Sequence, residues 1–296
     1  MKRLSQRSAF AVLLAAGATI GTLADQTPPH VPLRVGDYLV LSGDFHVHAF
    51  PGDGALAPWV LRQEAARAGL DVIAVTNHNQ SLTGRLAEWV SERGDGPLML
   101  TGQEITNPEY HMIAVGIDHA VNADQPAAGA IDDVHAQGGV AIAAHPSRRF
   151  HGYDDEAVAR LDGAEAAHSD IHRDDVFRAD LAAFFGRARG LNRGISAIGS
   201  SDFHLMPPGM GRCRTYLFVG ERSKVAVLDA IRSGRTLAVD GDGRLQGDPN
   251  LIRVLGVLRP EGRSNVNPVW RRLSLAMAWL GALGLVVFRN RPTTIK

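Results

Sequence analysis

The sequence lacks the residues on which several common kinds of protein depend. Its single cysteine, Cys213, cannot form a disulfide within the chain, and it cannot build a cysteine-rich zinc module or an iron–sulfur site. Its 31 basic and 31 acidic side chains give a formal net charge of zero, which argues against a nucleic acid polymer as a partner. Any bound metal ion would therefore need histidine and carboxylate ligands, and the chain has 12 histidines.

Three widespread catalytic motifs are missing as well. The chain has no G-x-S-x-G nucleophile elbow, no P-loop, and no strand-linked G-x-G-x-x-G followed by an acidic residue. Serine hydrolases of that type, P-loop enzymes and dinucleotide-binding enzymes are thereby excluded. The 296 residues, 45% of them apolar, are enough for one core of barrel size or for two small domains.

The N-terminus begins like a secretory signal. Lys2, Arg3 and Arg7 precede a charge-free stretch over residues 8–24, which ends in small residues. Residues 1–24 are therefore expected to be a signal peptide. A retained N-terminal anchor is the alternative, since the stretch approaches the roughly 17 to 25 residues of a membrane helix, and a cytosolic amphipathic start is a further one.

A second apolar segment lies near the C-terminus. Residues 273–288 carry no charge and are flanked by arginines, but they are short for a membrane span. We expect a short transmembrane or interfacial helix there, with a buried helix as the alternative, after a linker at 263–272 and before a basic tail at 289–296. The basic tail favours a cytoplasmic end. Both ends therefore predict an exported protein, whose globular part lies in the periplasm or on another extracytoplasmic face. They also predict that the membrane is a partner.

Between these ends, helix and strand patterns alternate. Apolar periodicity predicts helices over 57–68, 131–137 and 180–188, and strands over 71–76, 140–144 and 194–199. Three helix-to-strand units indicate parallel strands in an α/β fold. The periodicity alone suits a barrel and an open doubly wound sheet equally well.

Possible metal ligands stand where the expected strands end. His46 and His48 are two residues apart, so on a strand their side chains project from the same face. Four further apolar strands end at His78, at Glu104, at His145, and at Asp202 with His204. Catalytic sites of parallel α/β folds assemble at this carboxyl edge, so we expect these side chains to converge.

In this order the motifs resemble those of the polymerase and histidinol phosphatase (PHP) family of metal-dependent hydrolases. They are His-x-His at 46–48, Thr-Asn-His-Asn at 76–79, Gly-x-Glu at 102–104, His-Pro at 145–146 and Ser-Asp-x-His at 201–204. The resemblance covers about residues 41–240 and is nearest to the carbaryl-hydrolase-like branch. It implies a distorted (β/α)7 barrel over residues 28–262, with its metal site at the C-terminal ends of the strands.

The resemblance also implies nine ligands for two or three divalent ions, which could be Zn, Mn or Fe. His46, His48 and Asp202 would hold a first ion, and Glu104 would bridge it to a second ion completed by His111 and His145. Asp53, His78 and His204 would hold a third. Relatives commonly carry aspartate where Asn77 stands, so a two-metal enzyme with a weak third site is an alternative. The residues expected to be catalytic are Glu104, Asp202 and His204.

The predicted function follows from such ions. A water that bridges two divalent cations becomes hydroxide near neutral pH, so the expected enzyme is a phosphoesterase for a small phosphomonoester or phosphodiester. Its anionic substrate would need further positive charge, for which the candidates are Arg148, Arg149, Arg212 and Arg214. A carbamate or carboxylate ester hydrolase on the same metal site, and a non-catalytic exported metal-binding domain, are the alternatives.

Three other residues have no assigned role. His168 and His172 are four residues apart and are expected in a solvated loop, although ligand or acid roles are alternatives. Glu165 resembles a strand end that lines the mouth of the barrel in relatives. The oligomeric state is left open by the sequence.

Overall fold

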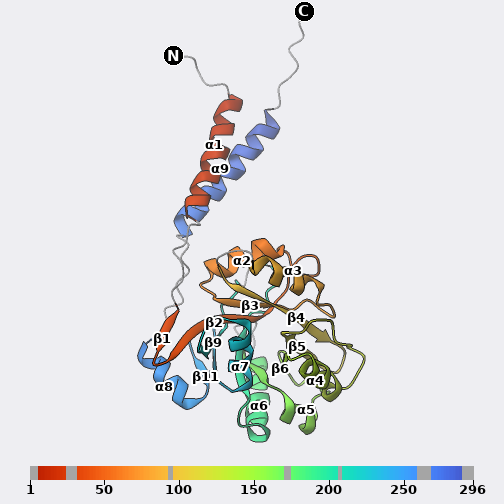
Figure 1. The fold of residues 1–296 in the computed structure, drawn as a ribbon. Helices are drawn as coiled ribbons and strands as arrows, with labels where there is room; N and C mark the ends of the chain where they lie inside the picture. Colours follow the sequence, from red (N-terminus) through yellow and green to blue (C-terminus); the bar gives the residue numbers. More distant parts are fainter. Residues whose placement is uncertain are drawn as a thin grey trace, which may run out of the picture. The chain divides into compact units, whose positions relative to one another are not determined.

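A mixed sheet of 11 strands runs through residues His30–Gly262, one of two compact units into which the chain divides (Figure 1). The structure is a computed structural model that describes residues 6–24, 32–92, 96–169, 175–205, 209–258 and 268–288. The strands are β1 Leu33–Val35, β2 Tyr38–Val47, β3 Val72–Val75, β4 Leu98–Thr106, β5 His111–Val115, β6 Val140–Ala143, β7 Gly163–His168, β8 Ser196–Ser200, β9 Arg214–Val219, β10 Thr236–Val239 and β11 Leu245–Gly247.

Helices follow or precede most of these strands. They are α1 Gln6–Ala24, α2 Pro58–Arg67, α3 Leu82–Ser91, α4 Ala127–Ala136, α5 Asp155–Arg160, α6 Asp175–Leu191, α7 Lys224–Arg232, α8 Pro249–Leu258 and α9 Pro268–Val287. The three helices and three strands expected from periodicity are confirmed, and their ends differ from the expected ones by at most five residues. The predicted α/β class is therefore correct.

The two ends of the sheet approach each other. The strand order is β11-β10-β9-β2-β3-β4-β5-β6-β7-β8, with β1 paired to β2. Thr236 in β10 donates its hydroxyl to the carbonyl of Ala197 in β8 at 3.0 Å, and the amide of Gly199 in β8 donates to the hydroxyl of Thr215 in β9 at 2.9 Å. The sheet is thus a nearly closed barrel, which confirms the predicted distorted barrel.

The strands of this barrel are not all parallel. Strands β2, β3 and β4 are parallel to one another, as are β6, β7 and β8, but β5 is antiparallel to both β4 and β6. Only residues 107–110 separate β4 from β5, too few for the crossover that a parallel strand requires. Strand β5 therefore begins at the edge of the sheet where β4 ends, and Thr106 pairs with His111.

The alternation of side chains along β2 separates the core from the site. Phe45 and Val47 are fully buried in apolar clusters, whereas Asp44, His46 and His48 project from the other face of the strand. All five side chains are buried, as expected for a strand inside a sheet covered on both faces. The two histidines consequently enter the barrel at the end of β2.

The second compact unit, Met1–Pro29 with Arg263–Lys296, contains α1 and α9. Helix α9 begins at Pro268, five residues before the segment expected at 273–288, because proline is tolerated in the first turn of a helix. The expected linker is therefore helical from residue 268; its preceding part and the basic tail at 289–296 lie outside the described residues. Among the described residues, Val269–Val287 form the one helix that is long and apolar enough to cross a membrane.

Candidate metal centre

All nine ligands expected from the sequence come together at one end of the barrel, where their donor atoms form three overlapping groups. His46 and His48 lie at the end of β2, and His78 follows β3. The remaining members come from the ends of β4, β6 and β8 and from the start of β5, and they are Glu104, His145, Asp202, His204 and His111. Asp53 lies in the turn after β2. The antiparallel direction of β5 brings His111 to this edge.

The first group is the most deeply buried. Nε2 of His46 lies 3.3 Å from Oε2 of Glu104 and 3.2 Å from Oδ1 of Asp202. Nε2 of His48 lies 3.4 Å and 3.1 Å from the same two oxygens. Within the described part of the chain, none of these four buried atoms has a hydrogen-bond partner. Buried polar atoms are normally satisfied, so this arrangement fits a divalent cation that all four would bind.

The second group shares Glu104 with the first. Its other oxygen, Oε1, lies 2.8 Å from Nδ1 of His111 and 3.1 Å from Nε2 of His145. One carboxylate therefore faces two groups of histidines with its two oxygens. This is the arrangement expected of a ligand that bridges two metal ions.

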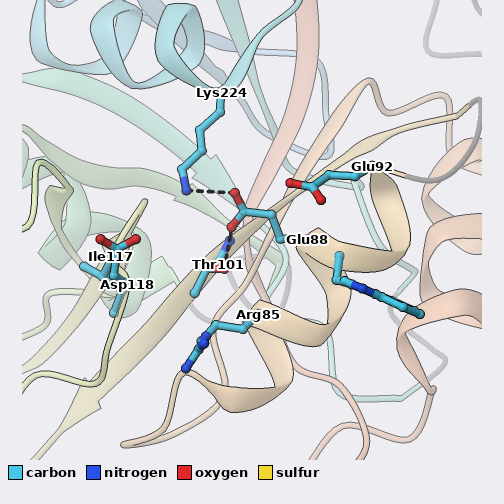
Figure 2. Close-up of a pocket in the computed structure, with 8 residues that line it drawn as sticks. Arg85, Glu88, Glu92, Thr101, Ile117, Asp118 and Lys224 are labelled. Atoms are coloured by element: carbon cyan, nitrogen blue, oxygen red, sulfur yellow. Dashed lines mark hydrogen bonds and ion pairs between the residues drawn. The ribbon is translucent and has the colours of Figure 1, made fainter.

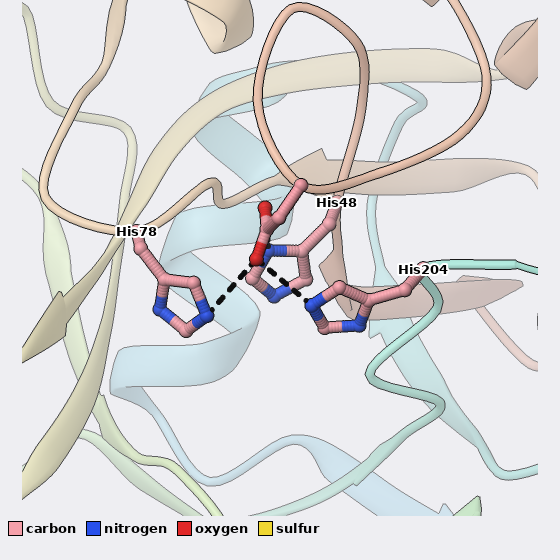
Figure 3. A group of neighbouring side chains, drawn as sticks. His48, His78 and His204 are labelled. Carbon is pink, nitrogen blue, oxygen red and sulfur yellow. Dashed lines mark hydrogen bonds and ion pairs between the residues drawn. The ribbon is translucent and has the colours of Figure 1, made fainter.

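The third group, of which Figure 3 labels His48, His78 and His204, is more open to solvent. Oδ2 of Asp53 lies 3.1 Å from Nε2 of His78 and 3.0 Å from Nε2 of His204. Its Oδ1 lies 3.0 Å from Nδ1 of His48. The Asp53, His78 and His204 side chains are 36–39% exposed, against 0–1% for His48 and Glu104. This group therefore forms the accessible side of the centre.

The carboxylates give the centre a strong preference for positive charge. Burial alone would lower the pKa of His46, but Asp202, Glu104 and Glu165 outweigh it and raise that pKa well above its ordinary value. In the same way, the nearby carboxylates of Asp202 and Glu104 raise the pKa of His48 to about 9 against the effect of burial. Burial would raise the pKa values of Glu104 and Asp202, yet the histidines lower both. A divalent cation would meet the same electrostatic demand.

Comparison with known proteins places this geometry in a known fold. No protein-family profile matches the chain. A two-domain protein from Bacteroides vulgatus, described as containing a predicted PHP-like metal-dependent phosphoesterase, superimposes with a TM-score of 0.63 over 78% of this chain and 74% of its own, at 22% identity. The fold is that of a PHP-like protein. The resemblance to the carbaryl-hydrolase-like branch stays a prediction.

Two further similarities were found. A putative metal-dependent phosphoesterase from Bifidobacterium adolescentis matches 57% of this chain and 90% of its own at 20% identity, with a TM-score of 0.45. The uncharacterized protein MJ1587 of Methanocaldococcus jannaschii is 27% identical over 150 residues, which are 46% of this chain and 86% of that protein.

In this PHP-like fold, three non-glycine residues of the described chain adopt positive φ, and all three lie in or next to the metal centre. They are Asn79 at 49°, His145 at 29° and Asp202 at 50°. Such backbone conformations are unfavourable for residues with a side chain, and they concentrate at functional sites. The fold thus holds two of the nine expected ligands, His145 and Asp202, in strained conformations.

Asn77 has a role that the sequence did not indicate. Its Nδ2 donates to the carbonyls of Ala49 at 2.6 Å and Pro51 at 3.2 Å, and its Oδ1 accepts from the amide of Ala49 at 2.9 Å. An aspartate could not donate to two carbonyls. The asparagine therefore holds the turn that leads to Asp53, and it supports the third group through that turn.

Glu165 and His168 join the centre although neither had an assigned role. Oε1 of Glu165 lies 2.9 Å from Nδ1 of His46, and its Oε2 accepts the backbone amide of His145. His168 ends β7, is 1% exposed, and has its Nε2 3.8 Å from Oδ2 of Asp202. The solvated loop expected at His168 is thus wrong, and His172 lies outside the described residues. A carboxylate within the apolar run Ala164–Ala167 is a signal that could have indicated a buried partner.

The four candidate arginines have different environments. Nε of Arg148 pairs with Oδ1 of Asp180 at 2.7 Å, and Arg212 is exposed. Arg214 donates to the carbonyls of Gly211 and Ala68 and to the hydroxyl of Ser42, so it holds the backbone together. The structure does not bring Arg214 to the ligands, because these three acceptors occupy its guanidinium.

Of the four candidate arginines, Arg149 is linked to the metal centre by a chain of side-chain contacts. Its guanidinium lies 5.9 Å from the centre of the Phe150 ring. That ring lies 4.6 Å from the ring of His111 and 5.8 Å from the ring of His145. Phe150 thus separates Arg149 from the second ligand group by one aromatic ring.

A separate pocket of about 350 Å³ lies at α3 (Figure 2). Glu88 within it accepts Nζ of Lys224 at 2.7 Å and the amide of Thr101 at 3.0 Å. None of the nine ligands lines this pocket. Since the Glu88 carboxylate is engaged by these partners, the pocket is not part of the metal centre.

Proposed function

We propose that this chain is a PHP-family metal-dependent phosphoesterase that hydrolyses a small phosphomonoester or phosphodiester. The observation that carries the proposal is the position of Glu104, whose two oxygens face two separate groups of histidines. A carboxylate shared in this way is what a two-metal hydrolytic site requires. The similarity of the fold to that of a PHP-like protein agrees with it.

Different side chains serve the first and the second metal position. When bound, divalent ions supply the charge that activates water and neutralises the oxygens of a phosphoryl group. His46, His48, Glu104 and Asp202 hold the first position, and His111 and His145 complete the second. The burial of His46, His48 and Glu104 excludes bulk water from the inner side, so the positions of these side chains are fixed before substrate arrives.

The third group faces the substrate side. Asp53, His78 and His204 are each more than one-third exposed, so a third ion there would be the most weakly held of the three. We propose two tightly bound ions and a third that exchanges readily, with Zn, Mn or Fe as the metal. His204 then contributes to catalysis at the open side of the centre, where Asp53 orients its Nε2.

One observation favours a second candidate function. Arg148 is paired with Asp180, and Arg214 is hydrogen-bonded to the backbone, so two of four candidate cations are engaged elsewhere. A neutral carbamate or carboxylate ester needs less positive charge than a phosphate. An ester or carbamate hydrolase on the same ligands is therefore the alternative, and an exported metal-binding domain without activity is the outcome if neither reaction occurs.

Hydrolysis by the full chain tests these functions directly. The protein would be purified in detergent, loaded with Zn, Mn or Fe, and given p-nitrophenyl phosphate, bis-p-nitrophenyl phosphate, p-nitrophenyl acetate and an aryl carbamate. Phosphate-selective turnover that is lost in Asp202→Ala and kept in Asp180→Ala supports the phosphoesterase. Turnover of the acetate or carbamate alone supports the second candidate, and no turnover by the metal-loaded protein contradicts both.

A further inference from the structure

The two terminal helices meet along a seam of small residues. A Cβ added to Gly17 of α1 would lie 2.6 Å from the backbone nitrogen of Ala278, and one added to Gly281 of α9 would lie 2.5 Å from the backbone nitrogen of Leu14. Gly284 packs in the same way against the ring of Phe10. Successive residues of α1 contact successively earlier residues of α9, so the helices are antiparallel, and their backbones approach closely at Gly17 and Gly281.

Polar and aromatic contacts also fix this pair. The hydroxyl of Ser274 is buried and donates to the carbonyl of Gly17 at 2.8 Å. At the other end of the seam, the rings of Phe10 and Phe288 stack with centres 5.4 Å apart. Close approach through small residues and a hydroxyl-to-carbonyl bond is how helices associate in lipid, where apolar attraction between them is absent.

The outer surface of the pair is apolar. Val12, Trp279, Leu283 and Val286 are 60%, 66%, 55% and 68% exposed, while small residues occupy the inside. A helical hairpin in water has the reverse distribution, with large apolar side chains between its helices. Within α9, Val269–Val287 are long and apolar enough to cross a bilayer, with Arg271 and Arg272 near the start of the helix, where their long side chains can reach the interface.

We propose that α1 and α9 form an antiparallel hairpin embedded in a lipid bilayer, so that α1 is a retained membrane helix and not a cleaved signal. The outer surface of the hairpin suits contact with lipid, because residues 8–24 and 273–288 carry no charge and the apolar side chains point away from the seam. Cleavage after α1 would leave the glycines and Ser274 of α9 facing lipid without a partner.

This hairpin fixes the topology of the chain. With two spans, both termini lie on one side of the membrane and the barrel between them lies on the other. Lys2 and Arg3 precede α1 and Arg7 lies in its first turn, and three more basic residues follow α9, at positions 289, 291 and 296, against Arg271 and Arg272 at the other end of α9. Basic residues beside a span stay on the cytoplasmic side, so the barrel faces the extracytoplasmic side.

A disulfide across the seam tests the hairpin. A Cβ at position 21 lies 3.6 Å from the Cβ of Ser274, within the range of about 3.5 to 4.5 Å seen in disulfides. We expect Gly21→Cys with Ser274→Cys to form a cross-link in native membranes under mild oxidation, detected by mass spectrometry of the joined peptides. Val12→Cys with Ser274→Cys is the matched control, because Val12 faces outward, and it should not cross-link.

Membrane extraction and N-terminal mass test the bilayer and the retention of α1. The full chain should resist alkaline carbonate, float with vesicles of phosphatidylethanolamine and phosphatidylglycerol, and keep its N-terminal peptide. Trp279→Glu should weaken flotation several-fold and Trp279→Leu should not. A mature chain that begins after α1, release by carbonate, or equal cross-linking in the control pair overturns the proposal. Hydrolytic activity is measured separately, so its absence would contradict the proposed function without affecting the hairpin.

Discussion

Oε1 of Glu165 lies 2.9 Å from Nδ1 of His46, and both side chains are fully buried. The carboxylate accepts the Nδ1 proton and so leaves Nε2 of the same ring facing Glu104 and Asp202. Its second oxygen accepts the backbone amide of His145, a residue held at positive φ. Glu165 thus positions ligands of both inner groups without belonging to the set of nine.

Replacing Glu165 tests this positioning. Glu165→Gln keeps the shape of the side chain, but an amide cannot accept protons from both His46 and the His145 amide. Removing a partner that orients metal-bound histidines typically costs about 10- to 100-fold in metal affinity, and we expect a loss in that range. Competition with a fluorescent chelator measures it. Asp180→Asn, at the ion pair with the exposed Arg148, is the control that should leave metal affinity unchanged, and an unchanged affinity in Glu165→Gln would refute the role.

The bridging position of Glu104 predicts a loss that no single histidine would cause. Glu104→Gln removes a charge that faces both inner groups, so the metal content should fall to about one ion per chain or less, measured by elemental analysis after dialysis. Hydrolysis should fall by more than about 100-fold, beyond the cost of removing a supporting partner.

Asp53→Asn is the matched comparison for Glu104→Gln. Asp53 faces His78 and His204 in the exposed group, so this variant should lose one ion and keep the two inner ones. Equal losses of metal from the two variants would contradict the assignment of Glu104 as the bridge.

The convergence of the expected ligands could be predicted from the sequence because parallel strands bring their carboxyl ends to one edge. His46, His48 and Glu104 needed no knowledge of loops, since strand periodicity alone places their side chains. His111 was expected only through the family resemblance, because the antiparallel turn between β4 and β5 that brings it to this edge is not visible as a periodic pattern.

Side chains that act through long-range contacts were harder to predict. Arg214 follows the Asp202 loop in sequence, yet its guanidinium is taken by Ser42 and Ala68, which only the folded barrel brings near. Likewise Glu165 meets His46 across 119 residues of chain. The start of α9 at Pro268 also differed from the expected start at residue 273. Hydropathy alone ends the apolar segment at the charged Arg271 and Arg272, but a helix can continue through these residues.

The raised histidine pKa values predict a pH dependence of metal binding. In the metal-free protein Asp202 and Glu104 raise the pKa of His48 to about 9, so a proton must leave before Nε2 can bind a cation. Metal affinity should therefore rise with pH up to about 9, with protons released on binding. Calorimetry in buffers of different ionisation enthalpy measures both effects.

The same shift predicts that stability depends on pH in the metal-free protein but not in the metal-loaded protein. A histidine whose folded pKa is raised stabilises the fold fully below its unfolded pKa of 6.5, and this contribution is lost as pH rises towards about 9. The metal-free protein should lose thermal stability over this interval, while the metal-loaded protein should not, because the ion has replaced the proton. A melting temperature of the metal-free protein that stays level or rises between these pH values would argue against the shift.

The contact between Arg149 and Phe150 predicts which arginine binds an anionic substrate. Arg149 lies over the ring that adjoins His111, whereas Arg148 is paired with Asp180. Arg149→Ala should therefore raise KM for a phosphate substrate about tenfold, which corresponds to ~1.4 kcal/mol, with kcat little changed. Phe150→Leu, which removes the ring but keeps an apolar side chain, should reproduce part of that increase.

Arg148→Ala is the control and should leave KM within about twofold, and the assignment fails if Arg148→Ala and Arg149→Ala have the same effect. If neither variant alters KM for phosphate while hydrolysis of a neutral ester continues, the ester or carbamate function is favoured, because a neutral substrate does not need the guanidinium.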